Sequence, residues 1–291
     1  MRGFDFLSPV SLTAALRAID EAGRHYKILA GGTNVIPDLR SGGIRPRLVV
    51  DLGRVKALDY IREDKSSIKI GALTTISRLR ESAVIQKRAP LLWEATRSFA
   101  GPLVRNRATV GGNLADASPA ADTAVSLLAH NAKVKIRSLN GRRTVPLKAF
   151  FSGYRKTVLA PGEILVEIEI PFSPPGTKYG YCKLGRRNAM AVSVVSVAVA
   201  LRMKGKTCTD AAVAIGAVAP TPLRMATVET LLRGRKIDSE LARQCGELAA
   251  KSASPISDIR ASAEYRRIVC RNLTHQTICR CVGIEDQEGF R

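Results

Sequence analysis

Two periods of hydrophobic and polar residues run through the first half of this chain. Apolar residues at helical spacing begin at Leu12 and end before Gly23, which predicts a helix opened by Ser11. Further helices are predicted at 75–82, 91–99 and 119–128. Short apolar or β-branched runs predict strands at 3–7, 26–30, 48–51 and 68–70. Strands and helices that follow one another in this way indicate small α/β units.

The pattern changes in the second half. A period of two predicts half-buried strands at 133–138 and 164–170, and the Pro-rich run 171–176 is the clearest linker. Beyond it, strands are predicted at 192–201 and 208–217, and helices at 227–232, 241–250 and 261–277. Strands followed by helices indicate an α+β domain with an antiparallel sheet. We therefore expect α/β subdomains at 1–56 and 57–175, and an α+β domain at 176–291.

Two glycine pairs follow short apolar runs, and each precedes a predicted helix. The two glycine motifs are Leu29-Ala30-Gly31-Gly32-Thr33-Asn34-Val35 and Thr109-Val110-Gly111-Gly112-Asn113. Where glycine leaves no Cβ in the way, main-chain N–H groups can converge on an anion, so two such loops predict a diphosphate site. For a single pair, a tight turn that needs positive φ is an equally good explanation. After the second motif, Ser118 is predicted to cap a helix, with Pro119 at its first position and Asp122 in its first turn.

The charge balance bears on the choice of partner. The chain has 46 Lys and Arg residues against 25 Asp and Glu, a formal net charge of +21. Such a field attracts nucleic acid, acidic membranes or acidic proteins. The basic groups are dispersed and lack interleaved aromatic residues, which disfavours a single-strand binder. A basic nucleic-acid-binding protein stays open as an alternative, beside a basic surface that faces an acidic partner subunit.

The residues offer no catalytic group that could act alone. His25, His130 and His275 have no metal-ligand spacing, and the six cysteines contain no C-x-x-C pair. Phosphate-loop, nucleophile-elbow and G-x-G-x-x-G patterns are all missing. No apolar run resembles a signal peptide or a membrane span, so a cytoplasmic protein is expected. No catalytic or metal-binding residue is predicted, and any redox chemistry requires a bound cofactor.

The run from Arg105 to Thr123, read with residues 30–34, closely resembles the FAD-binding medium subunit of the molybdenum hydroxylases. That family includes carbon monoxide dehydrogenase and xanthine dehydrogenase-type enzymes. The resemblance continues through 150–155, 183–187 and 262–267, and so covers nearly the whole chain. It implies a fold of the vanillyl-alcohol-oxidase or PCMH type, with two α/β FAD-binding subdomains and a C-terminal α+β domain like that of the carbon monoxide dehydrogenase flavoprotein.

The resemblance also assigns roles to residues. The two glycine motifs would wrap the diphosphate of FAD, bound non-covalently because Thr33 occupies the place of a tethering histidine. Asp122 would accept hydrogen bonds from nucleotide or ribityl hydroxyls, and Phe99 would lie against the cofactor. Leu165 would pack beside the flavin through its main chain, and Lys183 would bring positive charge near it. Ordinary roles remain possible for a helix-start carboxylate, a core aromatic ring and a solvated lysine.

The function implied is electron transfer in a heterotrimer, assembled as a dimer of heterotrimers. A large subunit would hold the molybdenum cofactor, a small subunit would hold [2Fe–2S] clusters, and FAD in this chain would pass electrons to an external acceptor. An iron–sulfur insertion after the second motif is not expected, since no cysteine precedes Cys182. A stand-alone FAD-dependent oxidoreductase of the same fold is the second alternative.

Overall fold

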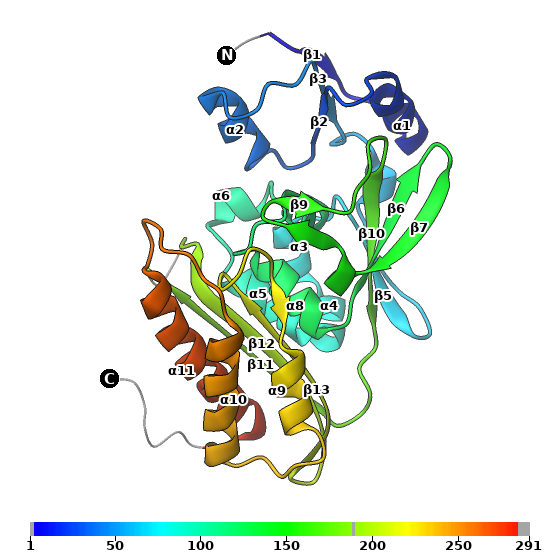
Figure 1. The fold of residues 1–291 in the computed structure, drawn as a ribbon. Coiled ribbons are helices and arrows are strands. Elements are labelled where there is room, and N and C mark those ends of the chain that lie inside the picture. Colours follow the sequence, from blue (N-terminus) through cyan, green and yellow to red (C-terminus); the bar gives the residue numbers. More distant parts are fainter. Residues whose placement is uncertain (1–2, 188–189, 285–291) are drawn as a thin grey trace.

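The computed structural model describes residues 3–187 and 190–284 (Figure 1). Its N-terminal part is a small parallel sheet whose strands are, in spatial order, β1 (Asp5–Leu7), β3 (Leu48–Asp51) and β2 (Tyr26–Leu29). Helix α1 (Leu12–Glu21) is capped by Ser11 and buries Ala15, Leu16 and Ile19. Helix α2 (Val35–Ser41) follows β2 after residues 30–34. The first glycine motif therefore connects the end of a strand to the start of a helix.

The middle part contains an antiparallel sheet, in the order β4 (Ile61–Glu63), β5 (Ser67–Gly71), β10 (Ile164–Pro171), β6 (Lys133–Ser138) and β7 (Gly141–Pro146). Its helices are α3 (Ile76–Glu81), α4 (Ala83–Arg88), α5 (Pro90–Arg97), α6 (Pro102–Arg105), α7 (Val110–Asp116) and α8 (Asp122–Ala129). Short 3-10 turns lie at Lys56–Leu58 and Leu147–Ala149, and β8 (Phe151–Gly153) pairs with β9 (Lys156–Thr157) as a hairpin.

The C-terminal sheet is antiparallel, in the order β11 (Thr177–Gly185), β12 (Ser193–Lys204), β13 (Thr207–Gly216) and β14 (Leu223–Arg224). Helices α9 (Ala226–Leu232), α10 (Ser239–Ser252) and α11 (Ala263–Val282) cover one face (Figure 1). Strand β12 is buried on both sides: Val197 and Val199 pack with these helices, whereas Ala198 and Ala200 pack with the core around α5 and α8. The small alanines let the middle part lie close to this sheet.

These observations confirm the predicted fold class, including the antiparallel sheet of the C-terminal domain. The division at 56 and 175 stays a prediction. Among the described residues, no helix is both long enough and apolar enough to cross a bilayer.

Two local predictions were wrong, and some elements were missed. The second glycine motif forms the first turns of α7 rather than a loop, because Thr109 caps it. The helix predicted to start at Pro119, with Ser118 as its cap, starts at Asp122, since the Pro119 carbonyl accepts the N–H of Ala217, just beyond β13, instead. Helix α4 and strands β7 and β11 were not anticipated. Strand β7 is mostly exposed and basic, so it shows no apolar alternation.

Candidate cofactor-binding site

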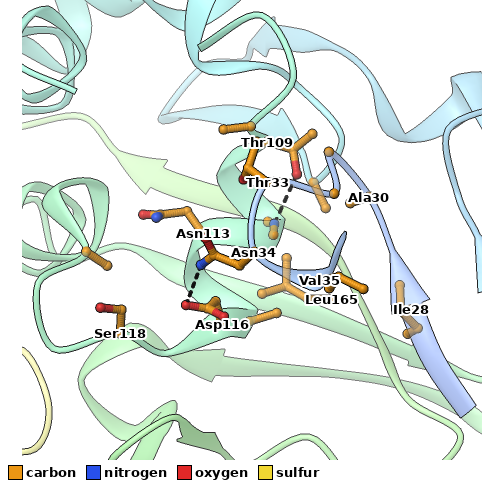
Figure 2. A pocket seen from close by; sticks show the side chains of 18 of the residues that line it. Ile28, Ala30, Thr33, Asn34, Val35, Thr109, Asn113, Asp116, Ser118 and Leu165 are labelled. Carbon is orange, nitrogen blue, oxygen red and sulfur yellow. Dashed lines mark hydrogen bonds between the residues drawn. The ribbon is translucent and has the colours of Figure 1, made fainter. Parts of the chain in front are cut away.

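A cavity of about 890 Å³ lies between the two glycine motifs, near the upper end of the range for small-molecule sites. Figure 2 shows side chains from both motifs pointing toward the same space. The predicted site residues that line it are Ala30, Gly31, Gly32, Thr33, Asn34, Val35, Phe99, Thr109, Gly111, Gly112, Asn113, Asp122 and Leu165. Three predicted residues do not line the cavity. Leu29 pairs with Asp51 in the sheet, Val110 is fully buried, and Lys183 forms an ion pair with the cavity residue Asp122.

Glycine is needed at these positions for different structural reasons. A Cβ on Gly31 would lie 1.9 Å from the carbonyl oxygen of Arg107, and one on Gly111 would lie 2.5 Å from the Cβ of Ala72. Both glycines therefore allow close contact within the protein itself, a reason that the sequence did not show. Gly32 has φ +75°, a left-handed conformation that only glycine adopts freely.

The two motifs differ in the main-chain donors that they offer. The second motif uses its amides internally, in the bonds Val110 N to Thr74 O (3.0 Å), Gly111 N to Ala72 O (2.9 Å), Gly112 N to Thr109 Oγ1 (3.1 Å) and Asn113 N to Thr109 O (2.9 Å). In the first motif, the N–H groups of Gly32, Thr33 and Asn34 have no acceptor among the described residues. The donors available to an anion are thus those of the first motif.

A polar network crosses the cavity rim. Asn34 Nδ2 donates to Asp116 Oδ2 at 2.8 Å (Figure 2), and Arg155 donates to Asp116 Oδ1 at 2.7 Å and to Asp38 at 3.1 Å. Asparagine suits position 34 because an aspartate there would face the carboxylate of Asp116. Sequence reasoning missed Asp116 and Arg155, since 39 residues separate them. Their only signal was their place in the runs that carry the family resemblance.

Asp122 and Lys183 form a buried ion pair, each side chain 7% exposed, with Nζ 2.5 Å from Oδ2. Ser193 donates to the other carboxylate oxygen, and Lys183 also donates to the carbonyl of Ser98. Burial raises the pKa of the Asp122 carboxyl, and the Lys183 ammonium opposes that rise. The carboxylate at the start of α8 is thus held by two residues of the C-terminal sheet.

These residues fit FAD. Free amides beside Gly32 suit a diphosphate, and Phe99, Leu165 and Val192 offer apolar surface to a flat ring. Among the described residues, no group of three or more His, Cys, Asp or Glu side chains is placed to hold a metal ion.

Residues 2–173 match the family model described as "FAD binding domain in molybdopterin dehydrogenase". Residues 180–280 match the "CO dehydrogenase flavoprotein C-terminal domain". The chain belongs to this family of FAD-binding subunits of molybdenum hydroxylases, which confirms the resemblance. It is therefore a flavoprotein component of an oxidoreductase, and FAD is its cofactor.

Individual relatives match along almost their whole length. The carbon monoxide dehydrogenase medium chain of Hydrogenophaga pseudoflava is 33% identical over 275 residues, covering 94% of this chain and 96% of the relative. The 6-hydroxypseudooxynicotine dehydrogenase complex subunit alpha of Paenarthrobacter nicotinovorans is 34% identical, covering 96% and 94%. A solved Hydrogenophaga pseudoflava carbon monoxide dehydrogenase lacking the Mo-pyranopterin moiety superimposes with a TM-score of 0.94 at 32% identity, covering 97% and 98% of the two chains.

Proposed function

We propose that this chain is the electron-transfer subunit of a molybdenum hydroxylase complex. It holds FAD non-covalently in the cavity and passes electrons from the [2Fe–2S] clusters of a small subunit to an external acceptor. The observation that carries the proposal is the large cavity between two glycine motifs, one of which has main-chain N–H groups without an acceptor in the described part of the chain. FAD, when bound, supplies chemistry that joins one-electron to two-electron transfer.

The residues of this chain have binding roles in the proposal. The amides of the first motif hold the diphosphate, and the second motif supplies the opposite wall. Phe99 and Leu165 pack against the flavin, and Asp122 is within reach of cofactor hydroxyls at the cavity surface. Lys183 acts through Asp122, because its charge is already paired. No side chain serves as an acid or base.

The partners follow from the relatives' descriptions as a medium chain and as a subunit of a complex. We propose a large molybdenum-containing subunit and a small [2Fe–2S] subunit, in a cytoplasmic dimer of heterotrimers. The net charge of +21 favours a partner that is acidic at the contact surface.

Flavin analysis tests the first step. The purified chain, reconstituted with FAD, should show the visible flavin bands, and acid precipitation should release FAD into the supernatant. A chain that binds no FAD contradicts the proposal. FAD that stays with the precipitate contradicts non-covalent binding.

Electron transfer is tested with the subunits together. The reduced small subunit should bleach the flavin of the reconstituted chain within the assembled complex. Reduction of the isolated chain by a small organic substrate would instead establish a stand-alone oxidoreductase. Tight, salt-dependent binding of DNA or RNA in the absence of flavin binding would favour the nucleic-acid alternative.

A further inference from the structure

The wall of the cavity beside Phe99 is a turn of residues 98–101 between α5 and α6. Ala100 in this turn has φ +35°, on the left-handed side that its Cβ disfavours. Phe99 and Ala100 both line the cavity. A residue held in a disfavoured conformation at a binding site needs contacts that keep it there.

Two cations supply those contacts. Arg105 Nη1 donates to the carbonyl oxygens of both Phe99 and Ala100, each at 2.9 Å. Lys183 Nζ donates to the carbonyl of Ser98, also at 2.9 Å. Three successive carbonyls of the turn therefore accept hydrogen bonds from charged donors, which are stronger than bonds from neutral ones.

Arg105 makes these contacts without an acidic partner. No carboxylate in the described part of the chain forms an ion pair with it. Burial lowers the pKa of its guanidinium, and the charge of Arg80 acts in the same direction. A partly desolvated cation is unfavourable unless hydrogen bonds compensate it, and here the turn carbonyls do so. Arg105 also ends α6, two residues before the Arg107 carbonyl that lies against Gly31.

We propose that Arg105 is a positioning residue for the flavin. It holds the turn 98–101 in its strained conformation, so that the Phe99 wall keeps a fixed place relative to the glycine motifs. Lys183 fixes the start of the same turn from the C-terminal sheet, so two parts of the chain set the wall together. The inference rests on the proposed function, because it assumes that FAD occupies the cavity.

A rescue experiment on the full chain tests this role. Arg105→Met should weaken FAD binding about tenfold, equivalent to about 1.4 kcal/mol. It should also change the visible circular dichroism of the bound flavin, since the turn relaxes away from it. The amides of the first motif still hold the diphosphate, so binding persists. Arg105→Met combined with Ala100→Gly should recover much of both signals, because glycine adopts positive φ without the support of Arg105.

Arg17→Met is the matched control, since Arg17 is exposed on α1 and its loss changes the net charge equally. It should leave flavin affinity and dichroism unchanged. Should Arg105→Met fail to fold, Arg105→Lys keeps a donor and should give intermediate dichroism. Wild-type dichroism in the Arg105 variants, or a loss that Ala100→Gly does not reverse, overturns the inference. A wild-type chain that binds no FAD contradicts the proposed function instead.

Discussion

At Gly31 the first glycine motif touches Arg107 and Ala108, the residues just before the second motif, and a side chain has no room. A methyl group there would meet the Arg107 carbonyl at 1.9 Å, and backbone cannot move aside as a flexible side chain can. Gly31→Ala should therefore separate the motifs, lower the unfolding free energy by about 3 kcal/mol or more, and abolish FAD binding. Gly153→Ala is the control, because its Cβ would meet only the Lys156 side chain at 3.9 Å. Thermal melts with and without FAD measure both effects, and equal losses in the two variants would refute the argument.

The buried His130 makes the free energy of unfolding depend on pH in the acid range. The ring is buried at the end of α8, its centroid 5.6 Å from that of Tyr179, and burial lowers its pKa to about 4. In the unfolded state the His130 ring therefore takes up a proton near pH 6.5, whereas in the folded state it does so only near pH 4. Stability from this group is complete above about pH 6.5 and decreases as the pH falls to about 4, by up to about 1.4 kcal/mol per pH unit.

His130→Phe should flatten that dependence, because it removes the titrating group and keeps an apolar ring. The measurement is the unfolding free energy from urea titrations at several pH values. His25→Gln is the control: His25 is exposed, so this variant should keep the wild-type slope. A slope unchanged in His130→Phe would place the acid sensitivity elsewhere, for example in paired carboxylates.

At the scale of elements, the predictable parts are those whose pattern reports burial directly. Helix α1 and strand β10 show clear periods and β12 is a continuous apolar run, and each lies where the sequence predicted it. Helix α7 was missed because glycine is a poor helix former, and its first turn depends on the Thr109 cap and on packing against Ala72. Strand β11 was missed because nearly all of its residues are of intermediate burial, which leaves no alternation to detect.

The site residues likewise divide into those that the sequence predicts and those that it does not. Residues within the two contiguous motifs were predictable, since a local run of small residues carries the signal. The Asp116–Arg155 pair and the contacts of Arg105 were not, because they depend on how separate turns pack. Asp122 and Lys183 were each singled out, but their mutual ion pair joins residues 61 apart in the chain.

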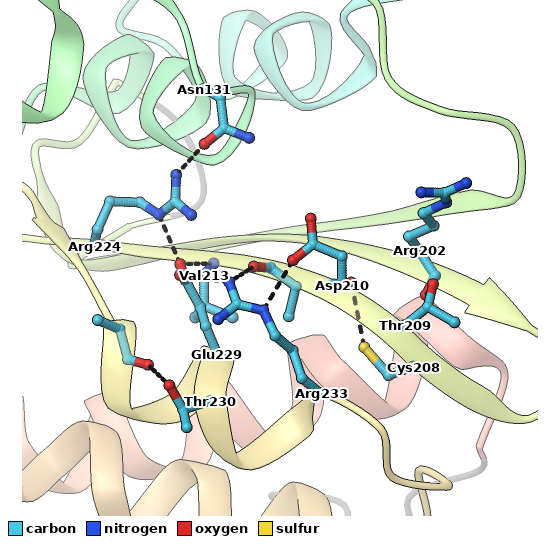
Figure 3. Close-up of polar contacts among 12 residues, drawn as sticks. Asn131, Arg202, Cys208, Thr209, Asp210, Val213, Arg224, Glu229, Thr230 and Arg233 are labelled. Atoms are coloured by element: carbon cyan, nitrogen blue, oxygen red, sulfur yellow. Dashed lines mark hydrogen bonds and ion pairs between the residues drawn. The ribbon is translucent and has the colours of Figure 1, made fainter.

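Helix α8 is fixed at both ends by the C-terminal domain. At its C-terminal end, Arg224 donates to Asn131 at 2.6 Å and to buried Glu229 at 2.7 Å (Figure 3), and also to the Leu128 carbonyl at 2.8 Å. Arg224→Met removes these bonds and leaves the buried Glu229 carboxylate with the N–H of Val213 at 2.9 Å and, as its remaining cation, Arg233 at 3.7 Å. The unfolding free energy should fall by about 3 kcal/mol.

The adjacent Arg233 gives a matched control. Its closer ion pair, at 2.9 Å, is with exposed Asp210, and without Arg233 the buried Glu229 keeps Arg224 at 2.7 Å. Arg233→Met should therefore cost less than about 1 kcal/mol. Adding Glu229→Gln to Arg224→Met should recover part of the loss, because no buried charge then lacks its partner. Urea denaturation measures all three variants. A loss in Arg233→Met as large as that in Arg224→Met would mean that burial does not set the energy of this network.

At the scale of the whole molecule, the net charge of +21 sets the response to salt. Even if every acidic group were paired, 21 positive charges would remain to repel one another. Exposed pairs such as Arg243–Glu247 contribute less than about 1 kcal/mol each, so screening them costs little. Repulsion over the whole surface acts across a screening length that shortens from about 30 Å to about 8 Å between 0.01 M and 0.15 M salt.

We therefore expect the melting temperature of the isolated chain to rise when NaCl is raised from about 10 mM to about 150 mM, because the screening length shortens over that range. The same screening should slow association with an acidic partner subunit, since attraction between opposite charges weakens as well. Stability and assembly rate then change in opposite directions with salt. Sucrose at matched osmolality separates screening from general solvent effects. A melting temperature that falls with NaCl would show that local ion pairs outweigh the net repulsion.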